Sequence, residues 1–162
     1  MHARSSPTRE ITTIGYEGTT VPQFLDALRD AGVEVVVDIR AVANSRRPGF
    51  SKSRLAANLE ESGIGYVHLR GLGTPADGRA AARAGRHEEM KRIFADHLTT
   101  DAARDDMERL VDLVETGSRL CLLCYEADAR HCHRRLVAKA LSERIGVDVR
   151  DLLPARDEDS HE

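Results

Sequence analysis

The sequence contains no long apolar run, and this absence limits where the protein can act. No hydrophobic stretch approaches the ~18 residues that a membrane-spanning helix needs, and residues 1–10 are polar, without the apolar core of a secretion signal. We therefore expect a cytoplasmic protein with no membrane partner. At the ends of the chain we expect a disordered lead-in over residues 1–9 and a flexible acidic tail over residues 154–162.

Cysteine is scarce, since the chain has three, all between positions 121 and 132. An odd number in one short stretch does not suit a disulfide framework and fits a reducing compartment. A chain of 162 residues can bury ~70% of its unfolded surface, so neither a disulfide nor a metal is needed to hold it together. Without internal repeats or a long linker, the chain is expected to form a single domain over residues 10–153.

Aromatic residues make up only 4% of the chain, and its formal net charge is -3. Proteins that bind nucleic acid usually present a basic surface with aromatic stacking groups, so nucleic acid is not the favoured partner. An accessory role on nucleic acid stays open through two local basic stretches, Arg46-Arg47 and the arginine-rich segment 70–86. These features leave the oligomeric state undetermined.

Strand-like and helix-like segments alternate along the chain. The patterns predict strands over residues 11–16, 33–39, 66–69, 120–125 and 147–153, and helices over residues 20–32, 53–62, 88–98, 101–115 and 132–144. This alternation predicts a three-layer Rossmann-like α/β domain with a mostly parallel sheet of about five strands. The segment 33–39, which contains Val35-Val36-Val37 and shows no polar alternation, should be a central strand. Segment 70–86 is expected to be a lid or a mobile insertion.

Chemically active side chains follow most of the predicted strands. In a parallel sheet with right-handed crossovers, the carboxyl ends of the strands meet at one edge, where α/β proteins bind ligands. We therefore expect convergence of Tyr16, Glu17, Asp38, Arg40, His68, Cys124 and Glu126 at that edge. Asp38 is the most informative of them, because a charge after a run of buried valines needs a partner or a role.

The segment Leu120–Arg135 joins a strand to a helix and carries Cys124, Cys132 and His133. A helix N-terminus and nearby basic residues stabilise the thiolate form of a cysteine. A thiolate suits a nucleophile, a redox thiol or a metal ligand. For Cys132, an inert packing role on the helix face that meets the sheet stays open. Cys121 and Cys124 have CxxC spacing, but residues three apart in a strand face opposite sides, so Cys121 should be a core residue.

The leading hypothesis is an enzyme that acts on a small phosphorylated, nucleotide-like or carboxylated substrate. Its catalytic residues would be Cys124 as nucleophile or redox thiol, His68 or His133 as the acid–base group, and Asp38 and Glu126 as orienting groups. The small anionic ligand would be held by arginine forks and neighbouring groups, namely Tyr16, Arg40, Ser45, Arg46, Cys132, His133 and Arg134.

Two other interpretations of the cysteine segment stay open. In the first, Cys124, Cys132 and His133 bind a metal or cofactor, although their spacing matches no standard zinc motif, so neither the metal nor a cofactor is identified. In the second, Cys124-x₅-Arg130 has the spelling of phosphatase and sulfurtransferase loops. Two carboxylates within residues 125–129 would repel a phosphate there.

Four motifs, in order, resemble the domain of unknown function 488 family. They are Thr13-Ile-Gly-Tyr-Glu-Gly18, Val37-Asp-Ile-Arg40 with Ser45-Arg46, Tyr66-Val-His-Leu69 with Leu72-Gly73, and Leu122-Leu-Cys-Tyr-Glu126 with Cys132-His-Arg134. Tyr125 stands where a small residue is more usual, which would narrow the pocket. The resemblance implies the same cluster at the strand ends and does not supply a reaction.

Overall fold

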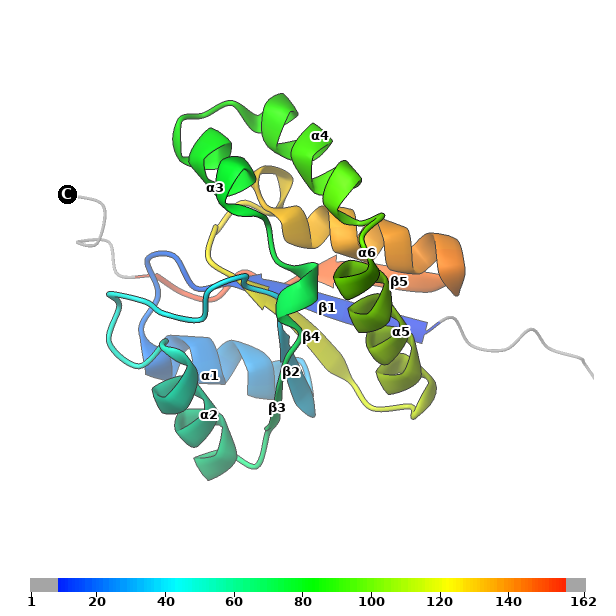
Figure 1. Cartoon of the computed structure of the whole chain (residues 1–162). Helices are drawn as coiled ribbons and strands as arrows, with labels where there is room; N and C mark the ends of the chain where they lie inside the picture. Colours follow the sequence, from blue (N-terminus) through cyan, green and yellow to red (C-terminus); the bar gives the residue numbers. More distant parts are fainter. Residues whose placement is uncertain (1–8, 157–162) are drawn as a thin grey trace, which may run out of the picture.

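The computed structural model describes residues 9–156 and contains a five-stranded sheet in which every neighbouring pair of strands is parallel (Figure 1). The strands are β1 (Arg9–Gly15), β2 (Val35–Asp38), β3 (Gly65–His68), β4 (Leu120–Cys124) and β5 (Val147–Asp151). They lie in the order β3-β2-β4-β1-β5. With helices on both faces, this arrangement confirms the predicted three-layer Rossmann-like fold.

Helices cover the two faces of the sheet unequally (Figure 1). One face carries α1 (Val21–Asp30) and α2 (Lys52–Glu61), and the other carries α3 (Ala76–Arg83), α4 (His87–His97), α5 (Asp101–Glu115) and α6 (His133–Arg144). Each layer buries its own apolar cluster, with Phe24 and Leu28 on the first side and Phe94 and Leu110 on the second. The sheet is therefore covered on both faces, as the apolar runs of β2 and β4 require.

The middle strand is β4, not β2. The run 33–39 was expected to be central, and β2 is indeed an interior strand with β3 and β4 as neighbours. The chain places β4 between β2 and β1, although β4 comes fourth in sequence. All five residues of β4 are buried, so its apolar run meets the demands of the central position equally well.

The helix predicted from residue 20 begins where its capping signals place it. Thr20 is the N-cap of α1, and its Oγ1 accepts a hydrogen bond from the backbone N–H of Gln23 at 3.3 Å. The side-chain Oε1 of Gln23 accepts in return from the backbone N–H of Thr20 at 3.0 Å. This reciprocal pair satisfies two N–H groups that the helix itself leaves free.

Segment 70–86 is not the irregular lid or insertion that was expected. It contains a 3₁₀ turn, η1 (Arg70–Leu72), followed by α3, and it packs into the core through Leu72 and Ala81, both 0% exposed. Small residues allow this close packing: a Cβ on Gly78 would lie 2.4 Å from Thr74 Cγ2. The glycine and alanine content that suggested a loop instead lets the helix lie tightly against its neighbours.

The ends of the chain add little regular structure. Arg9 already pairs within β1, opposite Val147 of β5, and residues 152–156 follow β5 without helix or strand. The expectations for residues 1–8 and 157–162 lie outside the described residues. Within the described part of the chain, no helix combines the length and the apolar character needed to cross a membrane.

Candidate functional site

A cavity of about 630 Å³ opens at the carboxyl edge of the sheet. Its walls come from the segments that follow β1, β2 and β4, from α3 and α4, and from the first residue of α6. Seven residues predicted from the sequence line it: Tyr16, Arg40, Ser45, Arg46, Cys124, Glu126 and His133. Side chains far apart in the sequence are therefore brought to one cavity by the parallel topology.

Four other predicted site residues lie at the same edge but do not line the cavity. They are Asp38, His68, Cys132 and Arg134. Asp38, Cys132 and Arg134 are buried and form no part of the cavity wall, so these three can act on the cavity only through neighbouring groups. His68 is partly buried, and its Nε2 lies 2.8 Å from the carbonyl oxygen of Arg40. Its ring thus supports the segment after β2.

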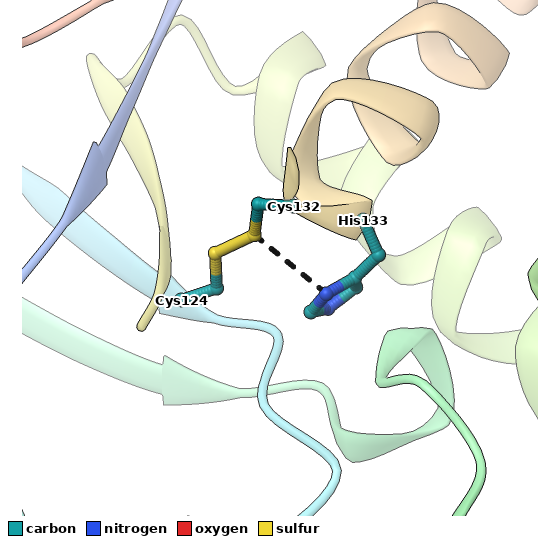
Figure 2. Close-up of side chains that lie close together, drawn as sticks. All are labelled: Cys124, Cys132 and His133. Atoms are coloured by element: carbon teal, nitrogen blue, oxygen red, sulfur yellow. Dashed lines mark hydrogen bonds between the residues drawn. A yellow bond between two sulfur atoms is a disulfide. The ribbon is translucent and has the colours of Figure 1, made fainter. Parts of the chain in front are cut away.

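Cys124 ends β4 and Cys132 is the N-cap of α6, and their sulfurs form a disulfide (Figure 2). This differs from the expectation that the three cysteines remain free. The loop between them includes a 3₁₀ turn, η2 (Ala129–His131), which brings the start of α6 back to the end of β4. Cys121 is free and buried, as predicted, and burial raises the pKa of its thiol to about 12.

His133 lies beside the disulfide, with its ring pointing toward the sulfur of Cys132 (Figure 2). Its Nε2 lies 2.7 Å from the carbonyl oxygen of Ile39. A carbonyl only accepts, so Nε2 carries the proton and Nδ1 has a free lone pair, 3.8 Å from Cys132 Sγ. Burial lowers the pKa of His133 to about 4, so the ring is neutral at neutral pH.

Arg134 is a fully buried cation that holds the loop after β4. Its NH1 donates to the carbonyl oxygen of Glu126 at 2.6 Å and to Cys124 Sγ at 3.1 Å, and its Nε donates to Thr13 Oγ1 at 3.1 Å. These donors face the protein interior, so Arg134 reaches the cavity through Cys124. Burial lowers the pKa of Arg134.

A second buried charge lies behind the cavity, where Arg40 makes two hydrogen bonds to the carboxylate of Asp38, at 2.9 and 2.7 Å. Tyr66 donates to the same carboxylate at 2.6 Å, and Arg40 NH1 also donates to Tyr16 Oη at 3.2 Å. Burial alone would lower the pKa of Arg40, but the bonds and charge of Asp38 raise it above its ordinary value. Asp38 thus has the partner that its position demanded.

Three more arginines complete the cavity wall, one from the Arg46-Arg47 pair noted in the sequence and two from the arginine-rich segment 70–86. Arg79 and Arg83 come from α3, and Arg47 follows Arg46 in the loop after β2. Arg47 donates to the carbonyl oxygen of Thr19 and Arg79 to that of Thr74. Among the described residues, Arg46 and Arg83 have no ion-pair or hydrogen-bond partner. The spacing of four between Arg79 and Arg83 would have placed both on one helix face had segment 70–86 been interpreted as helical.

One carboxylate faces these arginines within the described lining of the cavity, that of Glu126. Its Oε1 lies 3.8 Å from Cys124 Sγ. Burial raises the pKa of Glu126, so its proton is lost less readily than that of an exposed glutamate. The cavity is therefore strongly basic although the whole chain carries a formal net charge of -3.

Residues 20–141 match the model of the family described as Domain of unknown function DUF488. The chain belongs to this family. Comparisons with curated proteins and with solved structures gave no match. The range matched to DUF488 includes three of the four motifs noted in the sequence, after β2, around β3, and from β4 into α6, and so covers most of the cavity wall. The opening motif, Thr13–Gly18, precedes it.

In this DUF488 domain the opening motif nevertheless contributes to the site through close packing. A Cβ on Gly15 would lie 1.7 Å from the carbonyl oxygen of Glu126 and 3.0 Å from Arg134 NH1. The end of β1 therefore touches the backbone of the cysteine loop, and only glycine leaves room for that contact. Membership of the DUF488 family accounts for the shared motifs and leaves the reaction to be argued from the site.

Proposed function

We propose that this DUF488 domain is an enzyme that binds a small phosphorylated, nucleotide-like or carboxylated substrate in the cavity and acts on it through the cysteine–histidine centre at the cavity wall. The observation that carries the proposal is the wall itself. Four arginines, Arg46, Arg47, Arg79 and Arg83, face a 630 Å³ space in which the described lining holds one carboxylate.

The arginines are suited to an anionic group because guanidinium forks bind phosphate and carboxylate oxygens in pairs. Arg46 and Arg83 are exposed and have no partner among the described residues, so they are free to bind a ligand. Arg40 has most of its donors engaged by Asp38, Tyr16 and Phe50, and its charge is balanced by Asp38, so anion binding falls to the other arginines of the wall. A cavity of this volume fits a small molecule.

The reactive group would be the sulfur of Cys124 in its reduced form. It lines the cavity, and Arg134 NH1 donates to it at 3.1 Å, a contact that favours a thiolate. Two cavity-lining groups near Cys124 can accept or donate a proton. They are the neutral imidazole of His133 and the carboxyl group of Glu126, whose pKa burial raises. Cys132, next to Cys124 and protected from solvent, would control whether that thiol is free.

The anion half of the proposal is tested by titrating inorganic phosphate against thermal unfolding of the wild type, an Arg46→Ala/Arg83→Ala variant and an Arg54→Ala control. Arg54 is exposed on α2, away from the cavity. A ligand that binds only the folded state raises the unfolding temperature in a saturable way. We expect this rise in the wild type and in the control, and an at least tenfold weaker response in the double variant.

Phosphate also strengthens burial non-specifically, and all three proteins share that part of the response. Identical titration curves for the wild type and the double variant would overturn the anion site.

The thiol half is tested on the reduced protein by following iodoacetamide labelling at each cysteine with mass spectrometry. Cys124 should react faster than Cys121, whose buried thiol has a raised pKa. Saturating phosphate should slow the labelling of Cys124, because the bound phosphate and the Cys124 sulfur share one cavity. Labelling of Cys124 that is as slow as that of Cys121, or indifferent to phosphate, would contradict the assignment.

A further inference from the structure

We infer that, once the disulfide is reduced, Cys124, Cys132 and His133 form a binding site for a divalent transition-metal ion of the Zn²⁺ type. The inference goes beyond the proposed function: in the metal-bound form Cys124 and His133 are ligands, and it is the metal-free reduced form in which Cys124 would react as a thiol. The metal site depends on the reduced thiols and not on the arginine wall, so the two can be tested separately.

The geometry of the three donors carries this inference. Cys124 Sγ, Cys132 Sγ and a ring nitrogen of His133 all lie within 4.8 Å of one another, and all three residues are buried. Around a tetrahedral zinc ion with bonds of about 2.0–2.3 Å, donor atoms lie about 3.3–3.8 Å apart. Cys132 Sγ and His133 Nδ1, at 3.8 Å, already have this separation, and the two sulfurs reach it by moving apart once the bond between them is broken. The set of two thiolates and one imidazole is one that zinc accepts.

The backbone explains how two adjacent residues can reach one ion. Cys132 is the N-cap of α6, with extended φ and ψ of -124° and 144°, and His133 is the first helical residue. Their side chains are therefore not spread around a helix and both turn toward Cys124 (Figure 2). The α-carbons of Cys124 and Cys132 are 7.4 Å apart, beyond the ~6.8 Å usual for disulfides, which leaves room for two thiolates to flank an ion.

Neighbouring groups already orient these donors in the way that metal ligands are oriented. The Nε2–H of His133 is held by the carbonyl oxygen of Ile39 at 2.7 Å, so the lone pair of Nδ1 is directed at the sulfurs. Cys124 Sγ accepts from Arg134 NH1 at 3.1 Å, and Cys132 Sγ accepts from the backbone N–H of Arg134 at 3.4 Å. Such N–H···S contacts stabilise bound thiolates.

The fourth coordination position would face the cavity. Cys124 and His133 both line it, whereas Cys132 lies behind them. Three protein ligands with one open position are the arrangement of catalytic rather than structural zinc sites. A substrate oxygen held by the arginine wall would thus meet the ion directly.

Formation of the site is balanced in electrons and protons. A reductant of the phosphine class supplies two electrons, its phosphorus is oxidised to the phosphine oxide, the S–S bond breaks, and water supplies the oxygen and the two protons of the thiols. Binding of the ion to the two sulfurs then releases those two protons. Nδ1 of His133 contributes a lone pair without losing a proton.

The test uses the full-length, tag-free protein, reduced with a phosphine under anaerobic conditions and titrated with Co²⁺ as a spectroscopic probe for Zn²⁺. We expect one equivalent to bind with a sulfur-to-cobalt charge-transfer band and the visible spectrum of a tetrahedral ion. The protein with its disulfide intact should show neither. This comparison needs no variant and is therefore independent of effects on folding.

Variants assign the ligands in the same titration. Cys132→Ser and His133→Ala should each lower the Co²⁺ affinity at least tenfold, while Cys121→Ala, which leaves all three donors in place, should bind as the wild type does. Sub-stoichiometric binding by the reduced wild type, or unchanged affinity in Cys132→Ser, would overturn the metal site. Loss of metal with phosphate binding intact would overturn this inference alone, whereas metal binding without any phosphate response would overturn the anion site alone.

Discussion

Asp38 is the side chain around which the residues behind the cavity are arranged. It is 0% exposed and accepts hydrogen bonds from both Arg40 and Tyr66. Loss of any one of these partners leaves a buried carboxylate oxygen with an unsatisfied hydrogen-bond acceptor. The contribution of Tyr66 to stability can be measured on its own, because its hydroxyl group loses its proton at high pH.

Replacing Tyr66 with phenylalanine should destabilise the protein by about 1.5–3 kcal/mol at pH 8, because it removes a hydrogen bond to a buried charge. Burial, followed by the bond to Asp38, raises the pKa of Tyr66 above its ordinary value of 10.0. The folded state therefore keeps this proton to higher pH than the unfolded state does. The stabilisation is fully present below pH 10 and is lost as the pH rises above it.

Urea unfolding of the wild type and of Tyr66→Phe between pH 8 and pH 11 measures this effect. Other tyrosines and lysines also titrate in this range, but they are common to both proteins. The difference in free energy of unfolding should shrink above pH 10. A difference that stays constant across the range would show that Tyr66 does not hold its proton in the way described.

For single residues, the sequence predicted where the site lies better than it predicted the hydrogen-bond partners of each side chain. It placed Cys124, Glu126 and His133 at one edge because parallel strands end together, and they line one cavity. It treated Arg134 as an anion ligand, whereas its contacts hold the loop and the sulfur of Cys124. The direction of a long side chain depends on which backbone carbonyls surround it, and no local pattern contains that information.

Between elements, the end of β1 packs closely against the loop after β4, at Gly15 and Glu126. Glu17 N–H also donates to the carbonyl oxygen of Tyr125 at 2.9 Å, so the two segments run together past the end of the sheet. The position of the cysteine loop therefore depends on a glycine more than a hundred residues earlier in the chain.

Gly15→Ala should destabilise the protein by more than ~2 kcal/mol, because the new methyl group overlaps a carbonyl oxygen that cannot move without displacing Arg134. Gly146→Ala is the matched control, since a Cβ there meets nothing within 4 Å. The control should be neutral or slightly stabilising. Thermal and urea unfolding of the two variants would measure the contrast, and equal stabilities would refute the close packing at Gly15.

For whole elements, the patterns predicted α5 to the residue and the other strands and helices within a few residues. Capping residues such as Thr20 mark helix starts by local hydrogen bonds, which a sequence displays directly. The failure was α3, because glycine and alanine have little hydrophobic signature and their contribution is close packing against α4. Missing α3 also meant missing the two arginines that it brings to the cavity.

For the whole molecule, the charge of the cavity wall is opposite in sign to the net charge of the chain. The formal net charge is -3, yet the cavity wall is arginine-rich. Such an arrangement attracts a small anion that enters the cavity and repels a long polyanion that must lie along the surface. A small anion and a nucleic acid should therefore behave differently with salt.

We expect a fluorescently labelled single-stranded oligonucleotide to bind only weakly at low salt and to be released by ~0.15 M salt, because few cationic contacts are available. Fluorescence anisotropy, repeated with Arg46→Ala/Arg83→Ala, would measure this. Saturable binding at physiological salt that the double variant loses would support the nucleic-acid role over the small-ligand enzyme.

The position of β4 also bears on how the chain is made and folded. β1 and β2 do not pair with each other, and each pairs with β4, which begins only at residue 120. A chain emerging from the ribosome can join β2 to β3, but β1 must wait without a partner until the fourth strand is complete. The strand that ends in Cys124 is thus the one that joins β1 to the β2–β3 pair, and β5 is added to the edge of the sheet after it. The cysteine site therefore forms as the two parts of the sheet come together.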